Sequence, residues 1–109
     1  MDSDIKKFIE ACIIKGEAGE VGDSKTDNKQ YKIINSVYIL MKNSNRLDEF
    51  VNLLNHESPY VRLWASAYAL QVTNSMAEEV LETLADFKGL LGFEAMMTLQ
   101  EWRKGNLKF

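Results

Sequence analysis

Apolar residues recur along this chain at intervals of three and four, which is the spacing of an amphipathic α-helix. The pattern predicts six helices, at about residues 4–21, 25–43, 46–55, 59–70, 76–87 and 93–104. No segment alternates apolar and polar residues as a half-buried strand would, so we expect no sheet. The fold class predicted is therefore all-α, with about six helices paired as three helical hairpins.

Each predicted helix has one apolar face, which we expect to point into the core. In the first helix this face consists of Ile5, Phe8, Ile9, Cys12 and Ile13. In the second it consists of Tyr31, Ile34, Val37, Tyr38 and Met41, widened by Ile33 and Leu40. In the last helix the expected inward residues are Phe93, Met96, Met97 and Leu99. Cys12 is thus expected to be a buried thiol.

The predicted helix at 59–70 has the clearest start. Ser58 is a favourable N-cap, because its hydroxyl can accept a hydrogen bond from a backbone N–H one turn ahead. Pro59 then occupies the first helical position, where its missing N–H costs nothing. Asp23-Ser24 is the cap signal of the second helix, with Ser24 and Asp27 as a looser capping box. Gly105 is expected to end the last one.

Residues 47–70 align with residues 77–100 at an offset of 30 without a gap. The acidic pairs at 48–49 and 78–79 coincide, as do most apolar positions. Each unit is expected to form a short helix, a corner and a second helix, as in repeats that stack into a solenoid. We expect a single domain over residues 1–109, with a divergent first hairpin at 4–43 and repeat hairpins at 46–72 and 76–104.

The corner and second helix of the middle unit resemble a short HEAT repeat. The match rests on Leu53-Leu54, Ser58-Pro59, Val61-Arg62, Ala65 and Leu70. The whole chain is also similar to a family of small, single-domain bacterial HEAT-like proteins without an assigned activity, through segments at 23–31, 61–65 and 92–105. The resemblance implies a short right-handed HEAT-like solenoid and an immunity or interaction module rather than an enzyme.

Arg62 is a lone charge in a nearly apolar helix. In HEAT-like units an arginine at this position usually braces the corner, so the resemblance implies the same structural role here. Its partners would be backbone carbonyls or an acid, with Glu57 and Asp86 as candidates. A buried guanidinium requires such partners.

Composition narrows the class of protein. The chain has 109 residues, 46% of them hydrophobic, and a net charge of −3, which is ordinary for a globular domain and disfavours nucleic acid as the main partner. One cysteine permits no internal disulfide. No apolar run approaches the length of a membrane span, and residues 1–4 lack the basic region of a signal peptide. We therefore expect a cytoplasmic protein.

No catalytic or metal-binding motif stands in the sequence. His56-Glu57 begins a metalloprotease-like pattern, but Tyr60 occupies the position of the second histidine. With one histidine and one cysteine, the chain cannot assemble a zinc site from those ligands. The glycines at 16–22 do not follow a strand and form no phosphate loop. We expect no enzymatic activity, no cofactor and no metal.

Acidic residues gather on the predicted helix at 76–87, where they are Glu78, Glu79, Glu82 and Asp86. Within residues 76–100 the only base is Lys88. Such a strip is either a solvated helix face or a docking surface for a basic partner, in which charge mainly raises the association rate. Trp64 is expected in the core, whereas Trp102 is expected to be half exposed and is a candidate anchor for a partner.

The leading functional hypothesis is a non-enzymatic bacterial protein–protein interaction module, more specifically an immunity-type protein that binds a toxin-like partner. One alternative is a small scaffold that forms homodimers through an apolar end. Another is nucleic-acid binding through a stripe of Lys25, Lys29 and Lys32. Against the stripe, Asp27 lies among the lysines and no aromatic residue is interleaved to stack on bases.

Overall fold

The computed structural model describes residues 3–107, so Met1 and Asp2, on which the signal-peptide prediction partly rests, lie outside it. Its elements are α1 (Ser3–Glu20), α2 (Ser24–Asn43), the 3-10 helix η1 (Leu47–Leu53), α3 (Pro59–Ala69), α4 (Asn74–Ala85) and α5 (Leu90–Arg103). Residues 3–107 contain no strand, which confirms the all-α prediction. The elements belong to two compact units, residues 1–47 and residues 48–109.

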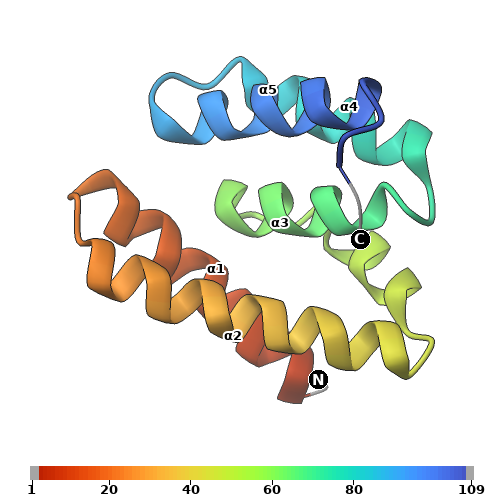
Figure 1. Ribbon diagram of the computed structural model, residues 1–109, viewed down its shortest axis with the longest axis horizontal. Helices are drawn as coiled ribbons and strands as arrows, with labels where there is room; N and C mark the ends of the chain where they lie inside the picture. The colour runs from red at the N-terminus through yellow and green to blue at the C-terminus, as the bar shows by residue number, and fades with distance from the viewer. Residues whose placement is uncertain (1–2, 108–109) are drawn as a thin grey trace. The chain divides into compact units, whose positions relative to one another are not determined.

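The N-terminal unit is a hairpin of α1 and α2, which lie side by side (Figure 1). α1 continues through both of its inner glycines, as the sequence predicts. The largest fully buried side chains of the unit are Phe8, Cys12, Ile34 and Met41. Two ion pairs join the ends of the hairpin: Lys15 Nζ lies 2.7 Å from Asp27 Oδ1, and Arg46 Nη1 lies 3.4 Å from Asp4 Oδ2.

Two residues predicted on the inward face of α2 are exposed instead. Tyr31 and Leu40 each expose 45% of their surface. Within this unit α2 packs against α1, so only a narrow face of α2, including Ile34 and Met41, is buried. Successive helical residues differ by about 100° around the axis, which places Leu40 beyond the edge of that face.

Three helices end in a Schellman motif. Gly22 follows α1, Asn45 follows α2 and Gly105 follows α5, with φ of 74°, 58° and 76°. At each position, the N–H of this residue and the N–H of the next residue donate to carbonyls of the last helical turn. At α5, for example, the N–H of Asn106 lies 2.9 Å from the carbonyl of Glu101. This arrangement satisfies carbonyls that a helix end otherwise leaves unpaired. The prediction that Gly105 ends the last helix is confirmed.

The cap signal Asp23-Ser24 does begin α2, but the looser capping box of Ser24 with Asp27 is wrong. The N-cap is Asp23, whose Oδ1 accepts a hydrogen bond from the N–H of Thr26 at 3.1 Å. Hydrogen bonds from the Thr26 side chain and then from its backbone N–H lower the pKa of the Asp23 carboxyl. Asp27 does not reach back to Ser24, because its carboxylate is paired with Lys15 of α1.

In the C-terminal unit, α3 packs against α4 and α5, and α4 and α5 form a hairpin (Figure 1). α3 is buried over most of its circumference, as its composition predicts. Phe50 of η1 packs on it, with ring centroids 5.3 Å apart between Phe50 and Tyr68. The buried hydroxyl of Ser66 donates to the carbonyl of Leu63 at 3.0 Å, so it is satisfied. Trp64, predicted in the core, is only partly buried.

The third predicted helix is a 3-10 helix rather than an α-helix, and it is shorter than the expected 46–55. An α-helix leaves its first four N–H and last four carbonyl groups without partners, which in seven residues is most of the backbone. The i to i+3 bonds of a 3-10 helix satisfy more of these groups in a short segment. Phe50 and Leu53 still reach the core from it.

The corner before α3 is closed by Arg62 and His56, and not by the predicted hydroxyl cap of Ser58. Ser58 lies at the N-cap with extended backbone, but its hydroxyl makes no capping bond. Its N–H instead donates to His56 Nδ1 at 3.0 Å. Arg62 Nη1 donates to the carbonyls of His56 at 2.7 Å and Glu57 at 3.2 Å. Two longer side chains therefore hold the corner, and Pro59 stands at the start of the helix as predicted.

The inward face of α5 is wrongly predicted. Phe93, Met96 and Met97 expose 55%, 41% and 36% of their surfaces, and of the four predicted residues only Leu99 is buried. The buried face consists of Leu91, Gly92, Ala95 and Leu99. Glycine is required at 92 because a Cβ added there would stand 1.8 Å from the carbonyl oxygen of Phe87, in the connection after α4.

Candidate protein-interaction surface

The four predicted acids lie on α4 or directly after it. The inward side of α4 is formed by Ala77, Leu81 and Leu84. Because residues of a helix are about 100° apart, Glu79, Glu82 and Asp86 lie on the opposite side, whereas Glu78 lies at the edge. Their exposure agrees: these three are exposed and Glu78 is half-buried.

Arg103, in the last turn of α5, holds two of these acids. Its Nε lies 2.9 Å from Glu78 Oε1 and its Nη2 lies 2.7 Å from Glu82 Oε1. Hydrogen bonds to Glu78 and then to Glu82 raise the pKa of Arg103 above its already high ordinary value. The guanidinium therefore stays charged, and it fastens the end of α5 to the beginning of α4.

Glu79 and Asp86, together with the Arg103-bound Glu82, border an open depression of about 460 Å³ on the outer side of α4. Its lining consists of Glu79, Glu82, Thr83 and Asp86. The hydroxyl of Thr83 donates to the carbonyl of Glu79 in the preceding turn at 3.1 Å, so it does not reach into the depression as a donor to these carboxylates. The depression is a place for positive charge rather than for an anion.

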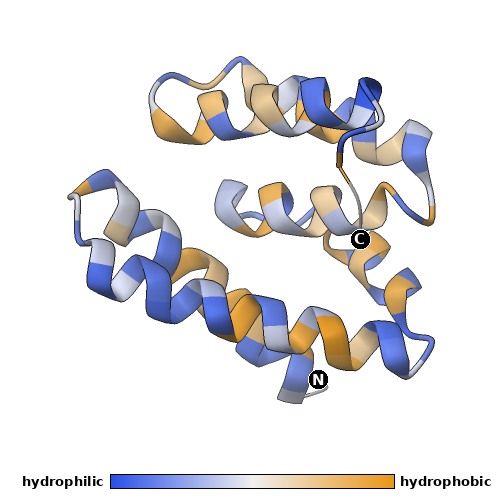
Figure 2. Cartoon of the chain, viewed as in Figure 1, coloured by the Kyte–Doolittle hydropathy of each residue, from blue (hydrophilic) through white to orange (hydrophobic). Residues whose placement is uncertain are grey.

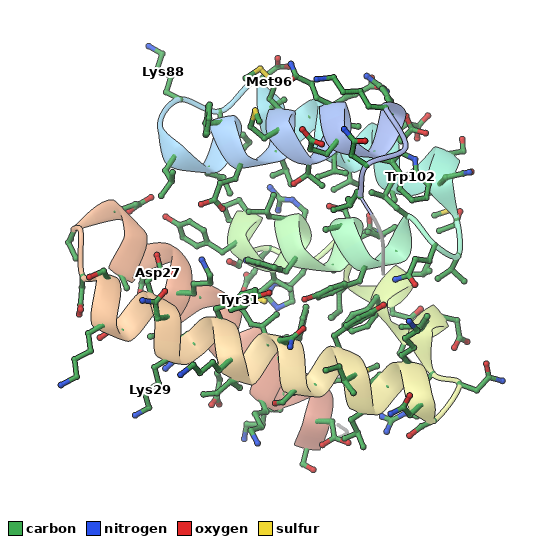
Figure 3. The ribbon with its side chains drawn as sticks, in the orientation of Figure 1. Asp27, Lys29, Tyr31, Lys88, Met96 and Trp102 are labelled. Carbon is green, nitrogen blue, oxygen red and sulfur yellow. The ribbon has the colours of Figure 1, made fainter. Side chains whose placement is uncertain are left out.

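Exposed apolar side chains accompany these acids in the α4–α5 hairpin. They are Phe87 in the connection and Leu90, Phe93, Met96 and Met97 on α5. Figure 2 shows hydrophobic residues at the start of α5, and Figure 3 shows Met96 and Lys88 projecting outward from the hairpin. Trp102, predicted to be half exposed, is partly exposed near the end of α5. The hairpin thus presents both charge and apolar area to solvent.

The residues considered for catalysis each serve the local structure of their own unit. Cys12 is fully buried in the N-terminal unit, where burial raises the pKa of its thiol well above the usual value, opposed only in part by the charge of Lys15. His56 belongs to the corner before α3 and its Nδ1 accepts a backbone N–H. Within residues 3–107, no three His, Cys, Asp or Glu side chains are placed to hold a metal ion. Over the same range, no helix combines the length and hydropathy of a membrane span.

The lysine stripe of α2 is exposed at all three positions, Lys25, Lys29 and Lys32. Figure 3 shows Lys29 pointing away from α1 and Asp27 toward it. Since Asp27 is paired with Lys15, it does not neutralise the stripe as the sequence suggested. The only nearby aromatic residue along this segment, Tyr31, lies toward the edge of the buried face rather than among the lysines.

Sequence reasoning missed Arg103 and the apolar part of this surface. Arg103 is 25 residues from Glu78 along the chain, yet a helical hairpin brings the last turn of one helix beside the first turn of the other. The predicted hairpin at 76–104 is therefore a signal from which this pairing could be found. The apolar part is missed because the sequence pattern places Phe93, Met96 and Met97 on the inward face of the last helix.

Comparison of this sequence and structure with models of protein families, with curated proteins and with solved structures finds no match.

Proposed function

We propose that this protein is a non-enzymatic protein-interaction module that binds a basic protein through the outer side of its α4–α5 hairpin. The observation that carries the proposal is the combination found there: exposed acids at Glu79, Glu82 and Asp86 in one hairpin with exposed Phe93 and Met97. Apolar side chains supply affinity when they are desolvated. Clustered charge selects the sign of the partner and speeds association.

A narrower form of the proposal is an immunity-type role, in which the basic partner is a toxin and both proteins meet in the cytoplasm. Its support is the resemblance of residues 47–70 to a HEAT repeat and of the chain to small bacterial HEAT-like proteins. Binding without catalysis fits a chain in which Cys12 and His56 are both committed to local structure.

Co-expression with the product of the adjacent gene tests this form. We expect a complex that survives purification and protects the host from that product. The triple variant Glu79→Gln, Glu82→Gln, Asp86→Asn should weaken the complex. Its affinity should also depend less on salt, because the charge pairs that salt screens are absent.

The matched control is the triple variant Glu10→Gln, Glu17→Gln, Glu20→Gln in α1, which changes the net charge equally at three other exposed acids. It should leave the complex unchanged. Failure to obtain either a complex or protection contradicts the immunity-type role. Equal weakening by both triple variants contradicts the assignment of the binding site to α4.

A further inference from the structure

The exposed apolar residues of α5 form a regular stripe rather than a scattered set. Leu90, Phe93 and Met97 stand at i, i+3 and i+7, and expose 45%, 55% and 36% of their surfaces. Phe87 and Met96 flank them with 42% and 41% exposed. We call Leu90, Phe93 and Met97 the α5 stripe. This spacing places the three side chains along one line of the helix over about two turns.

The α5 stripe plays no part in the core of its own unit. The residues that α5 buries against α3 and α4 are Leu91, Gly92, Ala95 and Leu99, on the other side of the helix. Isolated exposed apolar residues are common on proteins, but a contiguous apolar surface usually marks a site of interaction. A straight line of anchors two turns long matches the apolar face of a partner helix.

Acids lie on both sides of the α5 stripe, together with three bases: Lys88 just before it, Arg103 on the side toward α4, and Lys104, seven residues after Met97, in line with it. The edge of α5 that carries Arg103 faces α4, because Arg103 binds Glu78 and Glu82. Beyond that edge lies the depression lined by acids of α4. Glu94 and Glu101, seven residues apart, lie on the opposite edge of α5 and are half-buried. A helix lying along the stripe would therefore have carboxylates on each side.

This charge pattern selects the occupant. A second copy of the chain would bring this surface against itself. Acids outnumber bases six to three between residues 76 and 107, and like charges brought together at an interface cost free energy. An anionic membrane surface would be repelled in the same way. A helix with an apolar face and lysines or arginines beside it would instead pair its charges on both edges.

We propose that the α5 stripe docks an amphipathic helix with basic flanks. This inference rests on the proposed function and specifies the structure of the basic partner. The apolar face of that helix covers Leu90, Phe93 and Met97. Its basic residues meet Glu82 and Asp86 on one edge and Glu94 and Glu101 on the other.

The test is isothermal titration of the full chain with two synthetic peptides of about 18 residues. Both contain the same leucines and lysines; one has them at helical spacing and the other has them scrambled. We expect the helical peptide to bind at least about tenfold more tightly than the scrambled one. The double variant Phe93→Ser, Met97→Ser should remove most of this preference.

The matched control is Ile39→Ser in α2, which removes an apolar residue of similar exposure, 47%, from the other unit. It should bind as the wild type does, and circular dichroism of all variants should show unchanged helicity. Equal binding of both peptides overturns the docking of a helix, but it agrees with the proposed function, which requires only that the partner be basic. Binding of neither peptide overturns the helical docking and the proposed function together.

Two further outcomes overturn the proposal. One is undiminished binding of the helical peptide to the Phe93→Ser, Met97→Ser variant, which would place the contact elsewhere. The other is a dimer in light scattering that the same variant dissociates, which would assign the stripe to a second copy of the chain.

Discussion

At the residue scale, Arg62 shows how one side chain can close a corner without an acid. Its guanidinium donates to two backbone carbonyls, those of His56 and Glu57. Neither candidate acid, Glu57 or Asp86, pairs with it through a carboxylate among the described residues. The bracing role implied by the HEAT resemblance stays a prediction about stability, and the geometry restricts it to hydrogen bonds with carbonyls.

Replacement Arg62→Ala is expected to lower the free energy of unfolding by about 1.5–3 kcal/mol, the range for hydrogen bonds to charged groups. Urea denaturation measures the loss. Glu57→Gln should leave the stability unchanged within error, since Glu57 contributes its backbone carbonyl and not its side chain. An Arg62→Ala variant as stable as the wild type would contradict the bracing role of Arg62. A loss of stability in Glu57→Gln would instead support an ion pair between Arg62 and the Glu57 carboxylate.

Cys12 provides a second residue-scale prediction, through its raised pKa. The neutral thiol is favoured in the folded state, so its effect on stability is constant below the unfolded pKa of about 8.5. As the pH rises above that value, the unfolded chain ionises while the buried thiol resists, and the folded state is destabilised.

Accordingly, Cys12 in the folded protein should react with a thiol reagent at pH 8 at least about tenfold more slowly than in urea. Raising the pH from about 8 to about 10 should lower the stability of the wild type more than that of Cys12→Ser, whose side chain does not ionise there. Rapid labelling of the folded protein would show that the thiol is accessible.

At the scale of elements, the α4–α5 hairpin depends on one small residue. The connection uses Gly89 with φ of 82°, and Gly92 then lies against the backbone of Phe87. This close approach is what turns Leu91, Ala95 and Leu99 inward and leaves the α5 stripe outside. The register of α5 is therefore decided by backbone contact rather than by the largest apolar side chains.

Gly92→Ala should be strongly destabilising, by about 3 kcal/mol, because the added methyl would overlap a carbonyl that cannot move freely. Thermal unfolding followed by circular dichroism checks this value. Gly22→Ala is the comparison: no atom lies within 4 Å of its added Cβ, so only the positive φ opposes it, at a cost of about 1 kcal/mol. Equal losses at the two positions would contradict the close packing of α5.

At the scale of the whole molecule, charge of each sign collects on separate helices. Between residues 76 and 107 there are six acids and three bases, and one of those bases, Arg103, is bound to Glu78 and Glu82. Lys25, Lys29 and Lys32 form the contrasting basic stripe on α2. Because a chain with net charge −3 repels a polyanion overall, three lysines without stacking aromatics should not hold one.

We therefore expect no binding of a single-stranded DNA of about 20 nucleotides at about 150 mM salt. Fluorescence anisotropy of labelled DNA, across a series of salt concentrations, measures the binding. Weak binding at low salt should disappear in the variant Lys25→Gln, Lys29→Gln, Lys32→Gln. Tight binding at physiological salt that the variant abolishes would favour the nucleic-acid alternative over a protein partner.

The sequence by itself determined the helical class, the boundaries of most helices and several of their ends. Periodicity of three and four encodes helices locally, and Pro59 and Gly105 act within a turn of their own positions. The acids of α4 could also be located, since a helix face follows directly from spacing. These features need no knowledge of what lies across the fold.

Only the packed structure shows which side of α5 is buried and which charges meet. At the offset of 30, Ala65 and Ala95 are both fully buried, yet Leu63 is buried and its equivalent Phe93 is exposed. Sequence periodicity defines an apolar face of a helix but not which of its residues are buried, because burial depends on how closely the neighbouring helices approach. Arg103 and Glu78 are 25 residues apart in sequence, and Gly92 lies against Phe87 because the chain turns back at Gly89. Together these contacts leave the α5 stripe and the acids beside it at the surface.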